Sequence, residues 1–206
     1  MNTQNTNLKK RLNATTIETP RLLLKKLDRS ALPDMYEYGS MPAFYSNLDS
    51  KPFQTYADAE YYFERLMDLV ENKNSVYWAI WHKHDQKVIG TGGIRHYNAQ
   101  INDAEGTLGI SPLYQNGGLA VESFGYIHEY CFNQIGVNEI YGIVSSEHTK
   151  SIKMLDRIGY LKKLTLEKHF TKLDGRKYDA YNYVVSRDDF NKNSDLKKFL
   201  DGLNNV

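Results

Sequence analysis

The pattern of apolar and polar positions changes its period within the segment from Glu105 to Phe124. Leu108 and Ile110 alternate with small or polar residues, which predicts a strand, and Pro112 ends it because proline has no N–H for pairing. Further along, apolar residues recur at three- and four-residue steps, as on one face of a helix. These residues are Ala120, Phe124, Ile127, Cys131 and Ile135, and Gly136 follows them. A glycine there is typical of a left-handed C-terminal cap, so the segment predicts a strand, a turn and a long helix.

The turn between this predicted strand and helix has the sequence Gln115-Asn-Gly-Gly-Leu-Ala120. Gly117 and Gly118 let backbone N–H groups converge there, because neither residue has a Cβ atom. The N-terminus of a helix adds about half a positive elementary charge, so such a turn is suited to bind an anion such as a diphosphate. An ordinary turn between a strand and a helix explains the two glycines equally well.

A strand and two helices are predicted before this segment. Residues 20–27 have the pattern of a strand, and residues 28–38 that of a short helix with Pro33 in its first turn. A second helix begins at Thr55-x-x-Asp58 and carries apolar residues on one face. The connection at residues 40–53 contains prolines and aromatic residues, and it forms either a wall of a substrate site or a packed surface loop.

The middle of the chain predicts a meander of three strands. Residues 76–81 and 88–94 are strand-like and are joined by a link of hairpin length, and a polar loop at residues 96–103 leads into the strand from Glu105. The second of these strands contains Gly90, Gly92 and Gly93. Glycines inside a strand allow a close backbone approach, a bulge or a tight packing contact.

The last part of the domain predicts a further strand, a helix and a hairpin. Residues 139–145 have the pattern of a strand, and residues 149–158 that of a helix stopped by a glycine. Residues 161–170 and 178–185 alternate like the arms of a hairpin with its turn at residues 173–176. The order of all elements predicts the α/β (α+β) fold class with a mixed sheet.

The length of 206 residues fits a single domain that buries about 70% of the surface its unfolded chain would expose. We expect a flexible N-terminal lead at residues 1–16, which is polar and without period, and a folded domain at residues 17–187. A C-terminal helical extension is expected at residues 188–206. Within it, residues 195–203 carry apolar side chains at helical spacing, which favours a helix docked on the body over one that binds a partner.

Composition and charge exclude several classes of function. The net charge is +1 without a dense basic cluster, which argues against direct nucleic-acid binding because phosphate contacts need clustered Lys and Arg. The chain has no apolar run long enough to cross a membrane and no signal-peptide pattern, so we expect a cytoplasmic protein without a membrane partner. Cys131, the single cysteine, lies on the apolar helix stripe and predicts a reduced core thiol, and no metal site is expected.

Three motifs, in order along the chain, carry a resemblance to a known family. They are Thr19-Pro-Arg-Leu-Leu-Leu24, Gln115-x-x-Gly118-x-Ala120 and Ser146-Glu-His-Thr-Lys-Ser-Ile-Lys-Met-Leu-Asp-Arg-Ile-Gly-Tyr160. With the order of elements over residues 17–187, they resemble the GNAT superfamily of N-acetyltransferases, and within it the ribosomal-protein alanine N-acetyltransferase branch. The resemblance implies an N-acetyltransferase domain with a mostly antiparallel central sheet of about seven strands flanked by helices. It also implies acetyl-CoA as the acetyl donor, without a metal.

The resemblance further implies which residues bind acetyl-CoA. The backbone N–H groups of the turn would hold the diphosphate; these belong to Gln115, Asn116, Gly117, Gly118, Leu119 and Ala120. The strand end at Ile110 and Ser111 would pair with the pantetheine arm. His148 stands where the family usually has an asparagine facing the cofactor, and Ser151 would face the thiol end.

Glu105 and Ser151 are the candidate catalytic residues. Many relatives have a glutamate on this strand two residues before a glycine, where this chain has Thr107. Glu105 lies one step further along the same face, and it either reaches the amine through a water or is an ordinary strand-end carboxylate. The phenol that serves many relatives as general acid falls at Leu155, which has no proton to donate, so water or another hydroxyl would protonate the sulfur.

The acceptor is expected to be a primary amine that attacks directly in a ternary complex. Deprotonating an amine with a pKa near 8 costs about 1 kcal/mol at pH 7, whereas an amine with a pKa near 10.4 costs about 4.6 kcal/mol. A water-relayed carboxylate therefore favours a protein N-terminus or a nucleotide amino sugar over a polyamine or a lysine. The alternatives are an acetyltransferase for a nucleotide amino sugar or a polyamine, and a non-catalytic acyl-CoA-binding module.

Several other residues have open interpretations. His96, Tyr97 and Tyr126 either line the acceptor side or only pack. His128 lies off the apolar stripe of its helix and is predicted at the surface. We expect a monomer or a homodimer.

Overall fold

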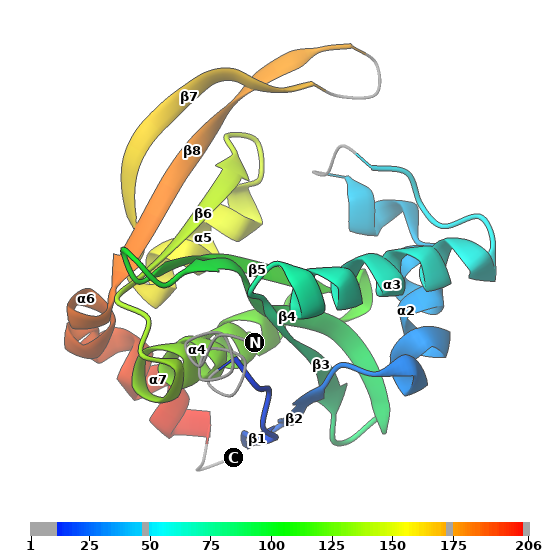
Figure 1. Cartoon of the computed structure of the whole chain (residues 1–206), viewed down its shortest axis with the longest axis horizontal. Coiled ribbons are helices and arrows are strands. Elements are labelled where there is room, and N and C mark those ends of the chain that lie inside the picture. Colours follow the sequence, from blue (N-terminus) through cyan, green and yellow to red (C-terminus); the bar gives the residue numbers. More distant parts are fainter. Residues whose placement is uncertain (1–11, 47–49, 172–174, 204–206) are drawn as a thin grey trace.

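The computed structural model describes residues 12–46, 50–171 and 175–203, which form one sheet with helices on both faces (Figure 1). Within these residues the sheet has eight strands in the order β1-β2-β3-β4-β5-β6-β8-β7. The strands are β1 (Ile17–Glu18), β2 (Leu22–Lys26), β3 (Val76–His82), β4 (Lys87–Asn98), β5 (Asp103–Ile110), β6 (Glu139–Ser145), β7 (Leu161–Thr171) and β8 (Lys177–Ser186). All neighbours are antiparallel except β5 and β6. The predicted fold class is confirmed, and the strand beyond the expected seven is the short β1.

The main helices are α2 (Leu32–Gly39), α3 (Tyr56–Asn72) and α4 (Leu119–Tyr130). The others are α5 (Thr149–Ile158), α6 (Arg187–Lys192), α7 (Ser194–Leu203), short 3-10 helices at Arg29–Ala31, Pro42–Tyr45 and Pro112–Tyr114, and a π-helical turn at Cys131–Ile135. Helices α2 and α3 pack on one face of the central strands and α4 packs on the other (Figure 1). The central strands are therefore covered on both sides.

Alternation along β3 divides the core between these two layers. Val76, Trp78 and Ile80 pack in the cluster that contains the α4 side chains, and Tyr77 and Ala79 pack in the cluster of α2 and α3. Successive side chains of a strand point to opposite faces, so a strand covered on both faces is apolar throughout.

Local sequence signals set the ends of several helices. The carboxylate of Asp58 accepts a hydrogen bond from Thr55 N at 2.8 Å and so caps α3. Gly136 and Gly159 end their helices with φ angles of 82° and 103°, the left-handed conformation that glycine adopts without strain. Pro33 lies in the first turn of α2, where its missing N–H has no helical acceptor.

The glycines of β4 serve a close approach of neighbouring strands. A Cβ atom at Gly93 would lie 2.0 Å from Val76 O, and one at Gly90 would lie 2.2 Å from Gly109 O. The three interpretations that the sequence left open are all observed. Gly90 and Gly93 allow the close backbone approach, the β3–β4 register shifts next to Gly90, and a Cβ atom at Gly92 would lie 2.9 Å from Leu108 Cδ1 in a tight packing contact.

Both described ends of the chain pack on the body. Residues 12–16 belong to the predicted flexible lead, yet Trp78 Nε1 donates to Thr15 O at 2.8 Å and Tyr130 donates to Asn13 O at 2.9 Å. At the other end, α7 is docked through Leu196, which is buried.

The structure corrects the expectation that His128 lies at the surface. His128 is buried, because α6 covers this side of α4 and Phe190 of α6 stacks on the imidazole. The predicted loop at residues 96–103 is also shorter than expected, since β4 continues to Asn98 and β5 begins at Asp103. The hairpin predicted at the end of the domain is formed by β7 and β8, and part of its predicted turn at 173–176 lies outside the described residues.

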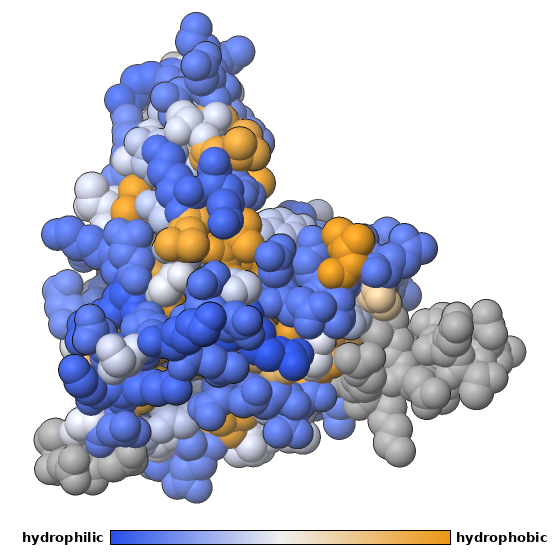
Figure 2. Space-filling model, turned by 90° about the vertical axis from the view of Figure 1, so that its left-hand side faces the viewer, coloured by the Kyte–Doolittle hydropathy of each residue, from blue (hydrophilic) through white to orange (hydrophobic). Residues whose placement is uncertain are grey.

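The hairpin of β7 and β8 projects beyond the rest of the sheet (Figure 1). Seen from that side, the surface is mainly hydrophilic and is interrupted by small groups of apolar side chains (Figure 2). Leu161 and Leu164 of β7 are among the exposed apolar residues. In the part of the chain that the structure describes, no helix has the length and apolar character needed to cross a membrane.

Candidate active site

A cleft of about 770 Å³ runs between the two halves of the sheet. Its lining comes from the connection of α2 and α3, from α3 itself, from β4, β5 and β6, from α5, and from the ends of β7 and β8. The cleft exists because the parallel strands β5 and β6 are paired only at Asp103–Glu105 and Glu139–Tyr141. Beyond Glu105 the two strands separate, and β5 has a free edge.

The free edge of β5 presents backbone polar groups to the cleft. Ser111 N donates to Ile89 O at 2.7 Å, so in this antiparallel ladder the N–H and C=O of residues 109 and 107 also face β4. The backbone groups of Leu108 and Ile110 consequently point away from β4, toward the side on which β6 has separated from β5. Neither of the two predicted strand-end residues lines the cleft itself. The C=O of Ile110 accepts from the Gln115 side chain, and the N–H of Ser111 donates to β4.

The glycine-containing turn follows this edge and leads into α4. Gly118 is the N-cap of α4 with a φ angle of 75°, and Glu122 N makes a hydrogen bond to Gly118 O. The preceding N–H groups of the first helical turn therefore have no intrahelical acceptor. Gln115 ties the turn to the strand end, since its side-chain amide donates to Ile110 O at 3.2 Å.

The turn also lies near the start of α5. Lys150 Nζ is 3.3 Å from Gln115 Oε1, and the neighbouring Ser151 lines the cleft. In the turn itself, Asn116 and Gly117 are exposed, whereas the Leu119 side chain is buried and Ala120 is partly buried. The predicted diphosphate turn and the start of α5 are therefore neighbours, but none of residues 115–120 lines the cleft itself.

His148 and Ser151 are joined at the N-terminus of α5. Ser151 N donates to Nδ1 of His148 at 3.3 Å, and both residues line the cleft. Burial lowers the pKa of His148, which favours the neutral imidazole. With Nδ1 accepting, the proton of the neutral ring is on Nε2, so His148 retains one donor.

Glu105 lies at the point where β5 and β6 separate. Its carboxylate is paired with Arg95 of β4, with Nη2 of Arg95 2.5 Å from Oε1, and both residues line the cleft. The pair arises because Arg95 and Glu105 are opposite each other in the β4–β5 register. Thr107, the next residue on the same face, also lines the cleft.

An aromatic wall closes the α3 side of the cleft. It consists of Phe44, Tyr45, Phe53 and Tyr62, whose consecutive ring centroids lie 5.1, 6.2 and 5.8 Å apart. Burial, with a contribution from Tyr62, raises the pKa of Tyr45 to about 12, and burial also raises the pKa of Tyr62. Both phenols therefore stay protonated at neutral pH. Part of the connection at residues 40–53 therefore lines the cleft, and its role as a substrate wall stays a prediction.

Other sequence candidates lie away from the cleft. His96 is exposed, Tyr97 is buried elsewhere, and neither they nor Tyr126 line the cleft. Leu155, at the position of the phenol in many relatives, does line it. Arg95 was not singled out from the sequence, because only the strand register brings it to Glu105.

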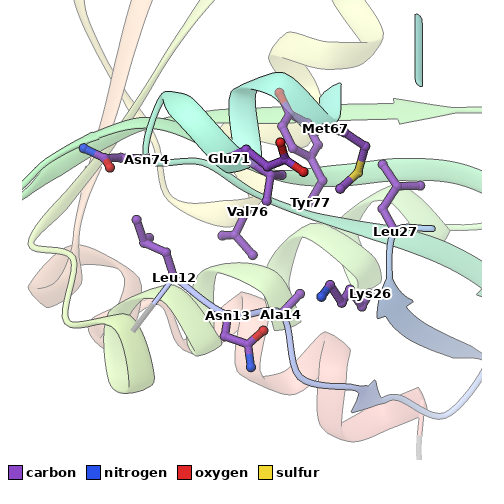
Figure 3. A pocket seen from close by; sticks show the side chains of 11 residues that line it. Leu12, Asn13, Ala14, Lys26, Leu27, Met67, Glu71, Asn74, Val76 and Tyr77 are labelled. Atoms are coloured by element: carbon purple, nitrogen blue, oxygen red, sulfur yellow. The ribbon is translucent and has the colours of Figure 1, made fainter. Parts of the chain in front are cut away.

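A smaller cavity of about 220 Å³ lies beside α3, between residues 12–14 and β3 (Figure 3). Polar side chains of Asn13, Lys26 and Glu71 lie around it with apolar ones (Figure 3). It shares no lining residue with the cleft, so it is a separate feature.

The family model described as Acetyltransferase (GNAT) domain matches residues 21–161. The chain belongs to the GNAT family. The uncharacterized N-acetyltransferase p20 of Bacillus licheniformis is 25% identical to this GNAT protein over 175 residues, which cover 85% of this chain and 98% of that protein. The expected family is thus confirmed, and the chain is an acyltransferase.

Solved structures of GNAT proteins share the fold. Spermidine N-acetyltransferase from Vibrio cholerae has a TM-score of 0.72 at 19% identity, covering 84% of this chain and 99% of that chain. Ribosomal-protein-S5-alanine acetyltransferase from Vibrio fischeri has a TM-score of 0.73 at 18% identity, covering 86% of this chain and 99% of that chain. At these identities the likeness concerns the fold alone.

Proposed function

We propose that this GNAT enzyme transfers an acetyl group from acetyl-CoA to a primary amine by direct attack in a ternary complex. The observation that carries the proposal is the free edge of β5, which is unpaired with β6 beyond Glu105 and where Leu108 lines the cleft. An extended pantetheine arm can pair with such an edge as an added strand would. Bound acetyl-CoA would supply an acetyl group activated as a thioester.

The residues present fit such a donor at three places along the site. The N–H groups from Gly118 onward suit its diphosphate, because helix N-termini bind anions. The edge of β5 suits the pantetheine arm, and the Nε2–H of His148 is a donor in the place of the asparagine of many relatives. A backbone N–H of Leu108 or Ile110 would polarise the thioester carbonyl.

Proton transfer is assigned to two side chains. Glu105 would accept the proton of the attacking amine through a water, and Arg95 would hold the carboxylate in place. The hydroxyl of Ser151 lines the cleft and is the proposed proton donor to the leaving sulfur, since Leu155 has none. The aromatic wall would hold the acceptor.

The charges of the acceptor side favour one group of acceptors. Lys51, Arg65 and Arg95 line the cleft together with Asp58 and Glu105, and both carboxylates already accept hydrogen bonds. A polyamine carries several positive charges and would need unpaired carboxylates. We therefore favour a protein N-terminus or a nucleotide amino sugar, although a fold relative is named a spermidine N-acetyltransferase.

A panel of amines, assayed by release of the free thiol from acetyl-CoA, tests the proposal. We expect turnover with an N-terminal peptide or an amino sugar, and less with spermidine. Binding of CoA without turnover of any amine would instead support a non-catalytic acyl-CoA-binding module.

A further inference from the structure

The motif from Thr19 to Arg21 does not line the cleft, yet it contacts the first turn of α4. There the carboxylate of Glu122 is fully buried. It accepts hydrogen bonds from Thr19 Oγ1 at 2.6 Å, Arg21 N at 3.0 Å and Arg21 Nε at 2.6 Å. Arg21 Nη1 also donates to Gly117 O at 2.7 Å. One arginine therefore joins a buried carboxylate of the helix to a carbonyl of the preceding turn.

The contact with Gly117 sets the direction of the next peptide N–H. In a trans peptide the C=O and the N–H point in opposite directions, and the described residues contain no cis peptide. Because Gly117 O points at Arg21, the N–H of Gly118 points away from Arg21. This N–H is one of the groups at the start of α4 that lack an intrahelical acceptor.

The C-terminal helix α7 packs on the same side of the turn as Arg21. A Cβ atom at Gly118 would lie 3.0 Å from Phe199 Cζ and 3.7 Å from Arg21 Nη2. Phe199 is itself held by Arg157 of α5, whose guanidinium carbon is 4.1 Å from the ring centroid. Arg21 and Phe199 thus form the back of the turn and leave its N–H groups directed outward.

We propose that Arg21 and Phe199 are positioning residues for the diphosphate site. In this proposal they do not touch the donor but act through the backbone of Gly117 and Gly118. The Thr19–Arg21 motif and the C-terminal helix then belong to the cofactor site, although they lie far from it in sequence. The inference rests on the proposed function, in which the turn holds the diphosphate of acetyl-CoA.

The test compares two acetyl donors in the full-length protein. Acetyl-CoA contains the diphosphate, whereas S-acetylpantetheine lacks it and occupies only the strand edge. For Arg21→Lys we expect about tenfold weaker CoA binding in calorimetry and a matching rise of KM for acetyl-CoA. The value of kcat/KM with S-acetylpantetheine should stay that of the wild type. The matched control is Arg29→Lys, since Arg29 lies in an exposed ion pair with Glu60. This variant should leave the CoA affinity and the kinetic constants for both donors unchanged.

Unchanged CoA affinity in Arg21→Lys, or equal losses with both donors, would overturn the inference, because a general structural defect does not distinguish the donors. Should Arg21→Lys fail to fold, Phe199→Leu provides the same comparison, with the same donor-selective loss expected. A wild-type protein that binds no CoA would overturn the proposed function itself. The two failures are therefore distinguishable.

Discussion

Nε2 of His128 and the hydroxyl of Tyr160 lie 2.7 Å apart in the core, and His128 is completely shielded from solvent. Nδ1 of His128 lies 2.7 Å from Phe124 O, the carbonyl one helical turn earlier. A carbonyl only accepts, so Nδ1 carries the proton and Nε2 accepts from Tyr160. The pair joins α4 to the residue that precedes β7 and depends on a neutral imidazole.

This pair predicts a loss of stability in weak acid. Burial lowers the pKa of His128 to about 3 from its usual 6.5, so the unfolded state binds a proton that the folded state does not. Stability should therefore fall as the pH drops below 6.5, by about 2 kcal/mol from this residue at pH 5. Denaturant unfolding of the wild type and of His128→Gln at pH 7.5 and pH 5 measures it. The variant should be less stable at pH 7.5 but less sensitive to pH.

The matched control for this prediction is His84→Gln, because the His84 side chain is 90% exposed. It should keep the pH dependence of the wild type. An identical loss between the two pH values in the wild type and in His128→Gln would contradict the assignment.

Replacing Glu105 separates catalysis from binding. Glu105→Gln removes the carboxylate charge but keeps the side-chain size, so we expect kcat to fall by about 100-fold while CoA affinity is retained. Thiol-release kinetics and calorimetry give the two quantities. Glu129→Gln, at an exposed position of α4, should leave both unchanged. A wild-type rate in Glu105→Gln would mean that the base lies elsewhere or that none is needed.

The N-cap of α4 should tolerate no residue other than glycine. Gly118→Ala places a Cβ atom 3.0 Å from Phe199 and forces a left-handed backbone, which together should cost about 1–3 kcal/mol of stability. Gly117→Ala is the control, because its φ is not positive and its Cβ would have only Leu119 Cγ at 4.0 Å. Thermal unfolding should give a lower melting temperature for Gly118→Ala than for Gly117→Ala. Equal melting temperatures of the two variants would argue against a constrained N-cap.

His148 should be replaceable by asparagine but not by alanine. An asparagine amide can accept from Ser151 N and still donate into the cleft, so His148→Asn should bind CoA like the wild type. His148→Ala loses both functions and should bind about fivefold more weakly, the equivalent of one neutral hydrogen bond. Calorimetry with CoA measures the affinities of both variants and of the wild type. Wild-type affinity in His148→Ala would remove His148 from the proposed site.

Local signals in the sequence predicted much of the fold. Gly136 and Gly159 mark helix ends because the left-handed conformation is a property of the residue itself. The capping pair Thr55 and Asp58 is equally local. The family resemblance gave only the expectation that the strand end at Ile110 and Ser111 pairs with a pantetheine arm. The separation of β5 from β6 was not predicted, since no single residue between Glu105 and Pro112 encodes it.

Contacts between distant segments could not be read from the pattern. The apolar periodicity of α4 wrongly placed His128 at the surface, because α4 is covered by the sheet and also by α6. A helical extension was expected at residues 188–206, but its packing on α4 was not. The buried carboxylate of Glu122 was missed because its partner Thr19 lies 103 residues earlier in the chain. Arg95 was missed for the same reason, since its role depends on strand register.

The separation of β5 from β6 has a consequence for solubility. An uncovered strand edge is normally a hazard, because it can recruit a strand from another molecule and start aggregation. Here the edge borders a cleft that β6 and α5 also line, so these elements lie on the side from which another strand would have to approach. The edge of β5 can thus stay unpaired in the folded protein while the surrounding elements limit its pairing with a strand of another molecule.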